Sequence, residues 1–205
     1  MRKDKANNYN LIMDTAIALF NQKGYDQISI NEICEKSGVS RSTFYNIFKN
    51  KDDLISSFFD KAIVLHENYI PIILSAENDL ERLWIVHELF LNMIVEAGSD
   101  VVKQVYKINL DENKGSFDDT FGADTWYLNP IKQCQSQEII RSPLTPEKLY
   151  FMMINFSIGL GYQWCANEGN FDVKAISFPV FEDLYDIAPE YRNLWQKVNQ
   201  NLNSI

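Results

Sequence analysis

A glycine turn between two short helical patterns constrains the fold of this chain more than any other feature. Ser29 followed by Glu32 is a capping box, in which the hydroxyl accepts the free amide three residues on and the glutamate reaches back. Gly38 can adopt the left-handed conformation that ends a helix and turns the chain sharply. Ser40 can then cap a second helix that runs to about Phe48. Two short helices around such a turn are the pattern of a helix-turn-helix.

The second of these helices has two chemically different faces. Its inner face is apolar, by i, i+3, i+4 spacing: Phe44, Ile47 and Phe48. Its opposite face is polar and carries one long cation: Arg41, Ser42, Tyr45 and Asn46. Reading DNA requires phosphate neutralisation and contacts to base edges. We expect Arg41 to pair with a guanine or clamp a phosphate, and Ser42 and Asn46 to reach base edges.

The segment from about Tyr9 to Ile55 resembles the DNA-binding domain of TetR-family transcriptional regulators. The matching residues occur in order and without gaps: Ala16, Leu19, Phe20, Gly24, Tyr25, Ser29, Glu32, Ile33, Gly38, Val39, Ser40, Thr43, Phe44, Tyr45, Phe48, Lys51 and Leu54. Cys34 departs from the alanine usual in the family, but both side chains are small.

The resemblance implies phosphate contacts from Thr43, Tyr45 and Lys51, which match family positions with that role. Ser29 and Lys49 are further phosphate candidates by the same reasoning. It also implies a homodimer that reads a palindromic operator in double-stranded DNA. We expect the dimer's four-helix bundle to form from Leu149–Asn167 and the C-terminal helices, roughly Pro179–Leu202.

The distribution of charge agrees with a DNA-binding N-terminus. Residues 1–51 hold eight Lys/Arg and five Asp/Glu, a net charge of +3, whereas residues 52–205 hold 11 and 23, a net charge of −12. A basic end on an acidic body suits a protein that meets nucleic acid at one end only. We predict a helix-turn-helix domain over 1–51, a linking fourth helix from about 51, and a helical ligand-binding and dimerisation domain over 52–205.

The remaining sequence predicts helices throughout. Apolar residues recur at helical spacing between Glu77 and Ala97, and Thr145-Pro146 can open a long apolar helix. Further helices are expected near 179–187 and 189–202. Alternating strand patterns are absent, so the predicted fold class is all-α. The uncharged run Leu149–Asn167 is long enough for a membrane span, but its dispersed polar and aromatic residues favour a buried helix.

The sequence contains no motif that indicates an enzyme or a metal-binding protein. The three cysteines are far apart, and neither they nor the two histidines have zinc-ligand spacing. Neither a Ser/His/Asp set nor a glycine-rich phosphate loop is evident, so we expect no catalytic residues and no cofactor. The polar N-terminus lacks an apolar signal core, and a cytoplasmic location is expected.

Aromatic residues crowd the second part of the chain, where the resemblance implies an inducer cavity. We select eight candidate pocket residues: His87, Phe90, Tyr106, Trp126, Tyr127, Asn155, Tyr162 and Gln163. Aromatic side chains at helical spacing also form ordinary cores, and His87 can be a satisfied core histidine. Glu88 and Glu96 could favour a cationic ligand, although such charges are usually solvated.

The predicted function is a sequence-specific DNA-binding transcriptional regulator, a dimeric repressor that a small-molecule effector releases. The alternative is a TetR-like co-activator or nucleoid-associated factor that binds a partner protein and has no small-molecule effector. An exposed apolar patch that remains once the dimer has formed would favour this alternative.

Overall fold

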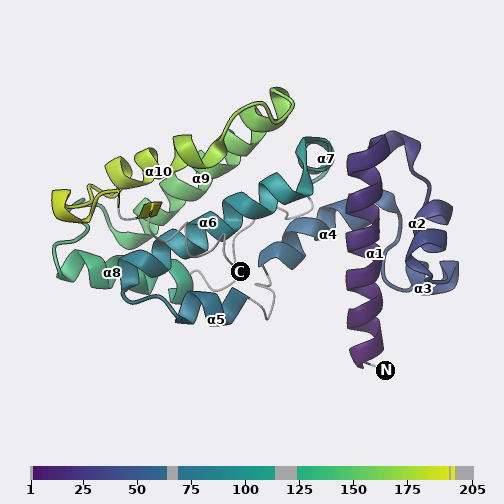
Figure 1. Cartoon of the computed structure of the whole chain (residues 1–205), viewed down its shortest axis with the longest axis horizontal. Helices are drawn as coiled ribbons and strands as arrows, with labels where there is room; N and C mark the ends of the chain where they lie inside the picture. Colours follow the sequence, from purple (N-terminus) through teal and green to yellow (C-terminus); the bar gives the residue numbers. More distant parts are fainter. Residues whose placement is uncertain (1, 64–68, 114–123, 194, 197–205) are drawn as a thin grey trace.

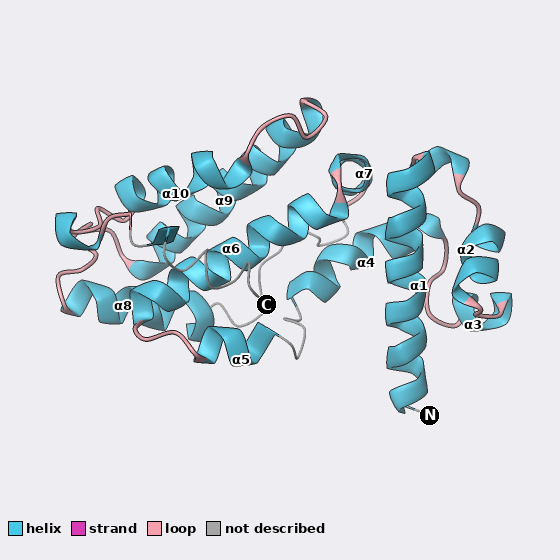
Figure 2. Cartoon of the chain, in the orientation of Figure 1, coloured by secondary structure: helices cyan, strands magenta, loops and turns pink. Residues whose placement is uncertain are grey.

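The computed structural model describes residues 2–63, 69–113, 124–193 and 195–196, which fold into helices joined by loops (Figures 1 and 2). In these ranges the only strand-like pairing is an isolated antiparallel bridge between Ile140 and Ile187. The predicted all-α class is confirmed. The elements in chain order are α1 (Arg2–Lys23), the 3-10 turn η1 (Tyr25–Gln27), α2 (Ile30–Ser37), α3 (Arg41–Tyr45), α4 (Lys51–Ile63), α5 (Tyr69–Leu74), α6 (Asp79–Ala97), α7 (Ser99–Asp111), the π-helical turn η2 (Asp124–Leu128), α8 (Asn129–Ser136), α9 (Pro146–Ala166), α10 (Val173–Leu184) and the 3-10 turn η3 (Pro189–Tyr191).

The N-terminal helices form a small head at one end of the molecule (Figure 1). We define the head as α1, η1, α2, α3 and the start of α4, and the body as α5 to α10. The inner faces of all these head elements supply one core, whose fully or almost fully buried members include Ile12, Ala16, Phe20, Ile33, Phe44, Phe48 and Leu54. The predicted apolar faces of the first helix and of the helix-turn-helix therefore meet in the head.

The body is built around α6. Every residue of α6 from Leu83 to Leu89 is buried, because other body helices surround its middle. Helices α8 and α10 both pack against α6, while α9 packs against α7, α8 and α10. This enclosure explains why α6 is apolar over most of its circumference.

Helix α7 joins the body to the head. It packs against α9 on the body side and contacts α1 and α4 on the head side. At the α6–α7 corner, Gly98 adopts φ = 82°, and a Cβ atom there would collide with the side-chain amide of Asn21 on α1. The positive φ at this junction is the conformation that calls for glycine.

Helix α10 begins six residues earlier than predicted. The sequence placed a helix near 179–187, whereas α10 starts at Val173, where Asp172 Oδ1 accepts the amides of Lys174 and Ala175. Pro179 lies inside this helix and cannot donate a hydrogen bond to the preceding turn. The prediction failed because it treated this proline as a helix start.

The C-terminal prediction also differs from the structure. The helix expected from Pro189 to Leu202 begins as the single turn η3, the chain is extended at Arg192 and has φ = 62° at Asn193, and residues 195–196 are helical again. Residues 197–205 lie outside the described part of the chain.

The long apolar helix was predicted correctly, since Thr145 Oγ1 accepts the Lys148 amide and opens α9. Among the described residues, no helix has the combined length and apolarity needed to cross a bilayer.

Candidate nucleic-acid interface

Three local devices build the predicted helix-turn-helix. The Ser29 hydroxyl accepts the amide of Glu32 at 3.2 Å and begins α2. Gly38 then ends α2 with φ = 68° and ψ = 14°, the left-handed conformation expected for it. The hydroxyl of Ser40 accepts the Thr43 amide at 3.1 Å and begins α3. Only half of the predicted capping box forms, because the Glu32 carboxylate pairs with Lys23 at 2.6 Å.

The faces of α3 are divided as predicted. Phe44 and Phe48 are buried, and their rings lie 5.6 Å apart. The side chains on the opposite face are exposed: Arg41, Ser42, Tyr45 and Asn46. Helix α3 is shorter than expected, since it ends at Tyr45, but the amides of Ile47 and Phe48 still donate to the Phe44 carbonyl. This face of α3 thus presents one cation, a phenol, a hydroxyl and an amide to solvent together.

The remaining phosphate candidates differ in exposure and in their contacts. Lys49 and Ser29 are exposed, and Tyr45 is 49% exposed with its ring edge-on to Phe44. Thr43 is half-buried, and its hydroxyl lies 2.8 Å from that of Ser40. The two hydroxyl candidates, Ser29 and Thr43, therefore also help to hold the helix ends.

Lys51 occupies a more constrained position. Its ammonium donates to the carbonyl oxygens of Tyr25 and Ile28 at 2.8 and 3.0 Å, and lies 4.0 Å from the centre of the Tyr25 ring. The Tyr25 hydroxyl donates in turn to the carboxylate of Asp52. We call Tyr25, Lys51 and Asp52 the loop clamp, because they fasten the loop after α1 to the first turn of α4.

Burial shifts the proton equilibria of the loop clamp. It lowers the pKa of the Lys51 ammonium, which nearby Asp26 and Asp52 partly oppose. It raises the pKa of the Tyr25 hydroxyl, and the bond to Asp52 adds to that effect. Tyr25 therefore stays protonated as a hydrogen-bond donor. The clamp was not foreseen, because its members lie 26 and 27 residues apart.

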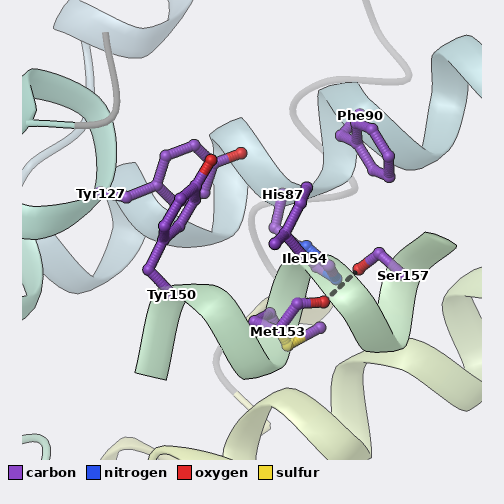
Figure 3. Close-up of a pocket in the computed structure, with 7 residues that line it drawn as sticks. All are labelled: His87, Phe90, Tyr127, Tyr150, Met153, Ile154 and Ser157. Carbon is purple, nitrogen blue, oxygen red and sulfur yellow. Dashed lines mark hydrogen bonds between the residues drawn. The ribbon is translucent and has the colours of Figure 1, made fainter. Parts of the chain in front are cut away.

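A pocket in the body lies between α6, η2 and α9 (Figure 3). Three of the eight predicted candidates line it: His87, Phe90 and Tyr127. The lining also includes four residues of α9 that the sequence did not single out as pocket candidates: Tyr150, Met153, Ile154 and Ser157. Helix α9 is apolar almost all round, so its sequence does not reveal which face borders a cavity.

The other five candidates lie outside this pocket. On α9, Asn155, Tyr162 and Gln163 are exposed, and Asn155 donates to the Phe151 carbonyl of its own helix. Tyr106 donates to the carbonyl of Ile158 on α9, and Trp126 packs partly buried against the core. Asn155, Tyr162 and Gln163 lie on the solvent-facing side of α9, which the sequence did not distinguish from its inner side.

His87 is a buried, hydrogen-bonded histidine that also borders the pocket. It is 3% exposed, and its Nε2 lies 2.7 Å from the hydroxyl of Ser177 on α10. The rings of Phe178 and Phe181 lie 5.7 and 5.5 Å from the imidazole. Burial in these surroundings lowers the pKa of His87 to about 3, so the ring is neutral at neutral pH.

The neighbouring Glu88 is not solvated, contrary to the sequence expectation for it. Its side chain is 1% exposed and its Oε1 lies 2.7 Å from the Lys174 ammonium on α10. Two polar contacts, His87–Ser177 and Glu88–Lys174, therefore connect α6 with α10 side by side.

All three cysteines are buried. Burial raises the pKa of all three thiols. The pKa of Cys134 rises to about 12 and that of Cys165 to about 11. These thiols are protonated at neutral pH, which disfavours a thiolate-based redox sensor.

We predict that His87 makes the protein less stable in mild acid. The unfolded chain binds a proton near pH 6.5, whereas folded His87 binds one only near pH 3, so stability is full above pH 6.5 and falls as the pH decreases towards 3. Between pH 7 and pH 5 this difference amounts to about 2 kcal/mol. The free energy of unfolding of the wild type and of His87→Gln is measured in urea at pH 7 and pH 5. Between these two pH values the wild type should lose about 2 kcal/mol more than the variant. Parallel pH profiles for the two proteins would contradict the prediction.

Comparisons with known proteins agree with this geometry. Residues 12–58 match the model of the family described as bacterial regulatory proteins, tetR family. The Transposon Tn10 TetC protein of Escherichia coli is 30% identical over 94 residues, which cover 46% of this chain and 48% of that protein, about half of each. The HTH-type transcriptional regulator AcrR of Shigella flexneri is 23% identical over 205 residues, covering 89% and 91% of the two chains.

Similarity in fold extends over most of the chain. The crystal structure of the transcriptional regulator FadR from Bacillus subtilis, in complex with stearoyl-CoA, superposes with a TM-score of 0.56 at 21% identity. The superposition covers 86% of this chain and 97% of that one, so it includes body as well as head. The head therefore matches the tetR family of bacterial regulatory proteins, and the chain as a whole shares the fold of FadR.

Proposed function

We propose that the protein is a dimeric, sequence-specific DNA-binding transcriptional regulator, and that it acts as a repressor released by a small-molecule effector. The observation that carries this proposal is the solvent-facing side of α3, where Arg41, Tyr45 and Asn46 project from a head whose core holds the helix in place. Such a regulator works on the chromosome, which is why we assign it to the cytoplasm.

Within this proposal, each exposed side chain of α3 has a role. Arg41 pairs with a guanine edge or a phosphate, and Ser42 and Asn46 contact base edges. The phosphate contacts come from residues on both sides of the turn and at the start of α4: Ser29, Thr43, Tyr45, Lys49 and Lys51. Phosphate contacts fix the register of the head, and base contacts supply the specificity.

An exposed apolar face supports the proposed dimer. Helices α9 and α10 pack side by side (Figure 1), and both expose large apolar side chains. Phe151 is 66% exposed, Tyr162 57%, Met152 44% and Ile176 42%. Exposed apolar patches of this kind mark protein interfaces. We propose that a second copy of the chain covers this face, so that two heads read the two halves of a palindrome.

The body supports the proposed control by a small molecule. The pocket beside His87, Phe90 and Tyr127 is lined mostly by apolar and aromatic groups, as ligand sites are. The solved FadR relative holds an acyl-coenzyme A, stearoyl-CoA. We propose a DNA-binding domain over 1–51 and a ligand-binding and dimerisation domain over 52–205, with α4 linking them. A ligand that binds one arrangement of the body more tightly would shift the position of the heads.

The first prediction from this proposed function concerns Arg41. Arg41→Ala should cost about 1–3 kcal/mol of operator affinity and relax the preference at one base pair of each half-site, because a bidentate contact is lost. Binding of wild type and variant to single-base operator variants measures this. Equal losses on operator and random DNA would contradict a base-reading role.

A second prediction separates the two roles of Lys51. Lys51→Met should lower the midpoint of thermal unfolding, because the loop clamp is lost, and weaken binding to operator and random DNA by the same factor. The slope of log affinity against log salt should also become shallower by about 2 for the dimer, one phosphate contact in each head.

Lys49→Met is the matched comparison for Lys51→Met, since Lys49 is exposed and not part of the clamp. In Lys49→Met the slope of log affinity against log salt should become shallower by the same amount as in Lys51→Met, but the midpoint of thermal unfolding should not change. An unchanged slope for Lys51→Met would mean that Lys51 acts through the clamp alone.

A third prediction tests the dimer face. Phe151→Glu combined with Tyr162→Glu should convert a species of twice 23.8 kDa into one of 23.8 kDa in sedimentation, because charge is placed on the apolar face. Operator affinity should fall by about 100-fold or more, since two linked heads bind far better than one. Leu74→Glu is the control, because Leu74 is 63% exposed but lies on α5. A wild type that sediments as a 23.8 kDa species would refute the dimer.

A further inference from the structure

The Lys51 ammonium is held at one place by contacts within the head. Its Nζ donates to the carbonyl oxygens of Tyr25 and Ile28 at 2.8 and 3.0 Å, which takes up two of its three N–H donors. The Tyr25 ring lies beneath it, with the ring centre 4.0 Å from Nζ. A solvated lysine loses rotamer freedom when it binds a phosphate. Lys51 has already lost that freedom on folding, so its binding to a phosphate costs less entropy.

Tyr25 is itself held from two other directions. Its side chain is 8% exposed, and its ring packs on the fully buried Phe20 ring of α1, with the two ring centres 5.1 Å apart. Its hydroxyl donates to the Asp52 carboxylate in the first turn of α4. The ring therefore cannot tilt away from the Lys51 ammonium without breaking the bond to Asp52 or leaving the Phe20 ring.

The bond from Tyr25 also gives the Asp52 carboxylate a partner other than Lys51. The charge of Asp52 acts on the Lys51 ammonium, because it opposes the fall in pKa that burial causes there. A carboxylate that paired directly with this ammonium would compete with a phosphate for it. The Tyr25 hydroxyl satisfies the carboxylate and so leaves the charge of Lys51 available to an anion.

The ammonium stands next to a second phosphate candidate. Ile28, whose carbonyl binds Lys51, immediately precedes Ser29. The exposed Ser29 hydroxyl accepts the Glu32 amide, and a hydroxyl that accepts one hydrogen bond can still donate its own hydrogen. A charged donor from the start of α4 and a neutral donor from the start of α2 therefore lie close together, although the two residues are far apart in the sequence.

We propose that Tyr25 is a positioning residue for DNA binding, which places the Lys51 ammonium beside Ser29 so that both bind one DNA phosphate. Its carbonyl and ring hold the ammonium, and the bond from its hydroxyl to Asp52 holds the ring. Tyr25 acts through Lys51 and does not itself contact the phosphate. This role rests on the proposed function, because it presupposes that the head binds DNA.

A double-mutant cycle in DNA binding tests this role. The affinity for a mixed-sequence duplex at low salt is measured by fluorescence anisotropy for the full-length wild type, Tyr25→Phe, Lys51→Met and the double variant. Tyr25→Phe keeps the ring on Phe20 but loses the bond to Asp52. It should weaken binding about fivefold in the wild type, but less than about twofold when Lys51 is already replaced. Equal losses in both backgrounds, or no loss in either, would overturn the positioning role.

Tyr9→Phe is the matched control. The Tyr9 hydroxyl donates to the Ser57 carbonyl at 3.0 Å and so ties α1 to α4, but Tyr9 is not part of the loop clamp. Tyr9→Phe should change the affinity for the duplex by the same factor with and without the Lys51→Met replacement. A coupling to Lys51 as large as that of Tyr25 would mean that loosening any tyrosine of the head has this effect, and would refute a specific role for Tyr25.

A measurement without DNA separates the positioning role from the proposed function. Side-chain NMR at low temperature follows the exchange of the Lys51 ammonium hydrogens with water. Exchange should be severalfold faster in Asp52→Ala, which deprives Tyr25 of its partner, whereas Asp52→Asn keeps an oxygen acceptor and should exchange like the wild type. Equal exchange in Asp52→Ala and the wild type would refute the positioning of Lys51 by Tyr25. A wild type whose Lys51 ammonium is held but which binds no duplex would instead refute the proposed function, and with it any role in DNA binding.

Discussion

The exposed face of α3, which we propose reads DNA, depends on the burial of two phenylalanine rings. A helix as short as α3 is not stable alone, because its first turn fixes several dihedral angles for each hydrogen bond gained. Phe44 and Phe48 are almost fully buried, and Tyr9 on α1 lies 5.0 Å from the Phe48 ring. Their packing holds α3 against the rest of the head. The loop clamp then fixes the start of α4, so contacts away from the exposed face of α3 help to hold Arg41 in place.

Helix α7 contacts both the head and the body. It contacts α1 and α4 on one side and α9 on the other. On the body side Tyr106 donates to the Ile158 carbonyl, and a Cβ atom on Gly161 would lie only 2.8 Å from its hydroxyl. At the other end Gly98 lets the corner approach Asn21. Close contacts at the start of α7 and in its middle thus connect it with the proposed DNA-binding head and with the proposed dimer helix.

Local chemistry decided which features could be predicted from the sequence. The helix-turn-helix was predictable because caps, a left-handed glycine and i, i+4 spacing act within a few residues, and the outer face of α3 followed from them. The pocket was predictable only in part, because α9 is apolar almost all round and its cavity-facing side depends on packing. The pairing of Glu88 with Lys174 joins residues 86 positions apart, which no local pattern indicates. Pro179 was mistaken for a helix start, although α10 continues through it.

Selection of bound fragments from a random DNA pool, by the purified protein at near-physiological salt, tests the proposed DNA-reading function most directly. A dimer whose two α3 helices enter successive major grooves should recover a palindrome with half-sites about 10–10.5 base pairs apart, or a multiple of that spacing. Recovery of no consensus, with only weak and salt-sensitive binding, would contradict sequence reading by α3 and favour a role in binding a partner protein.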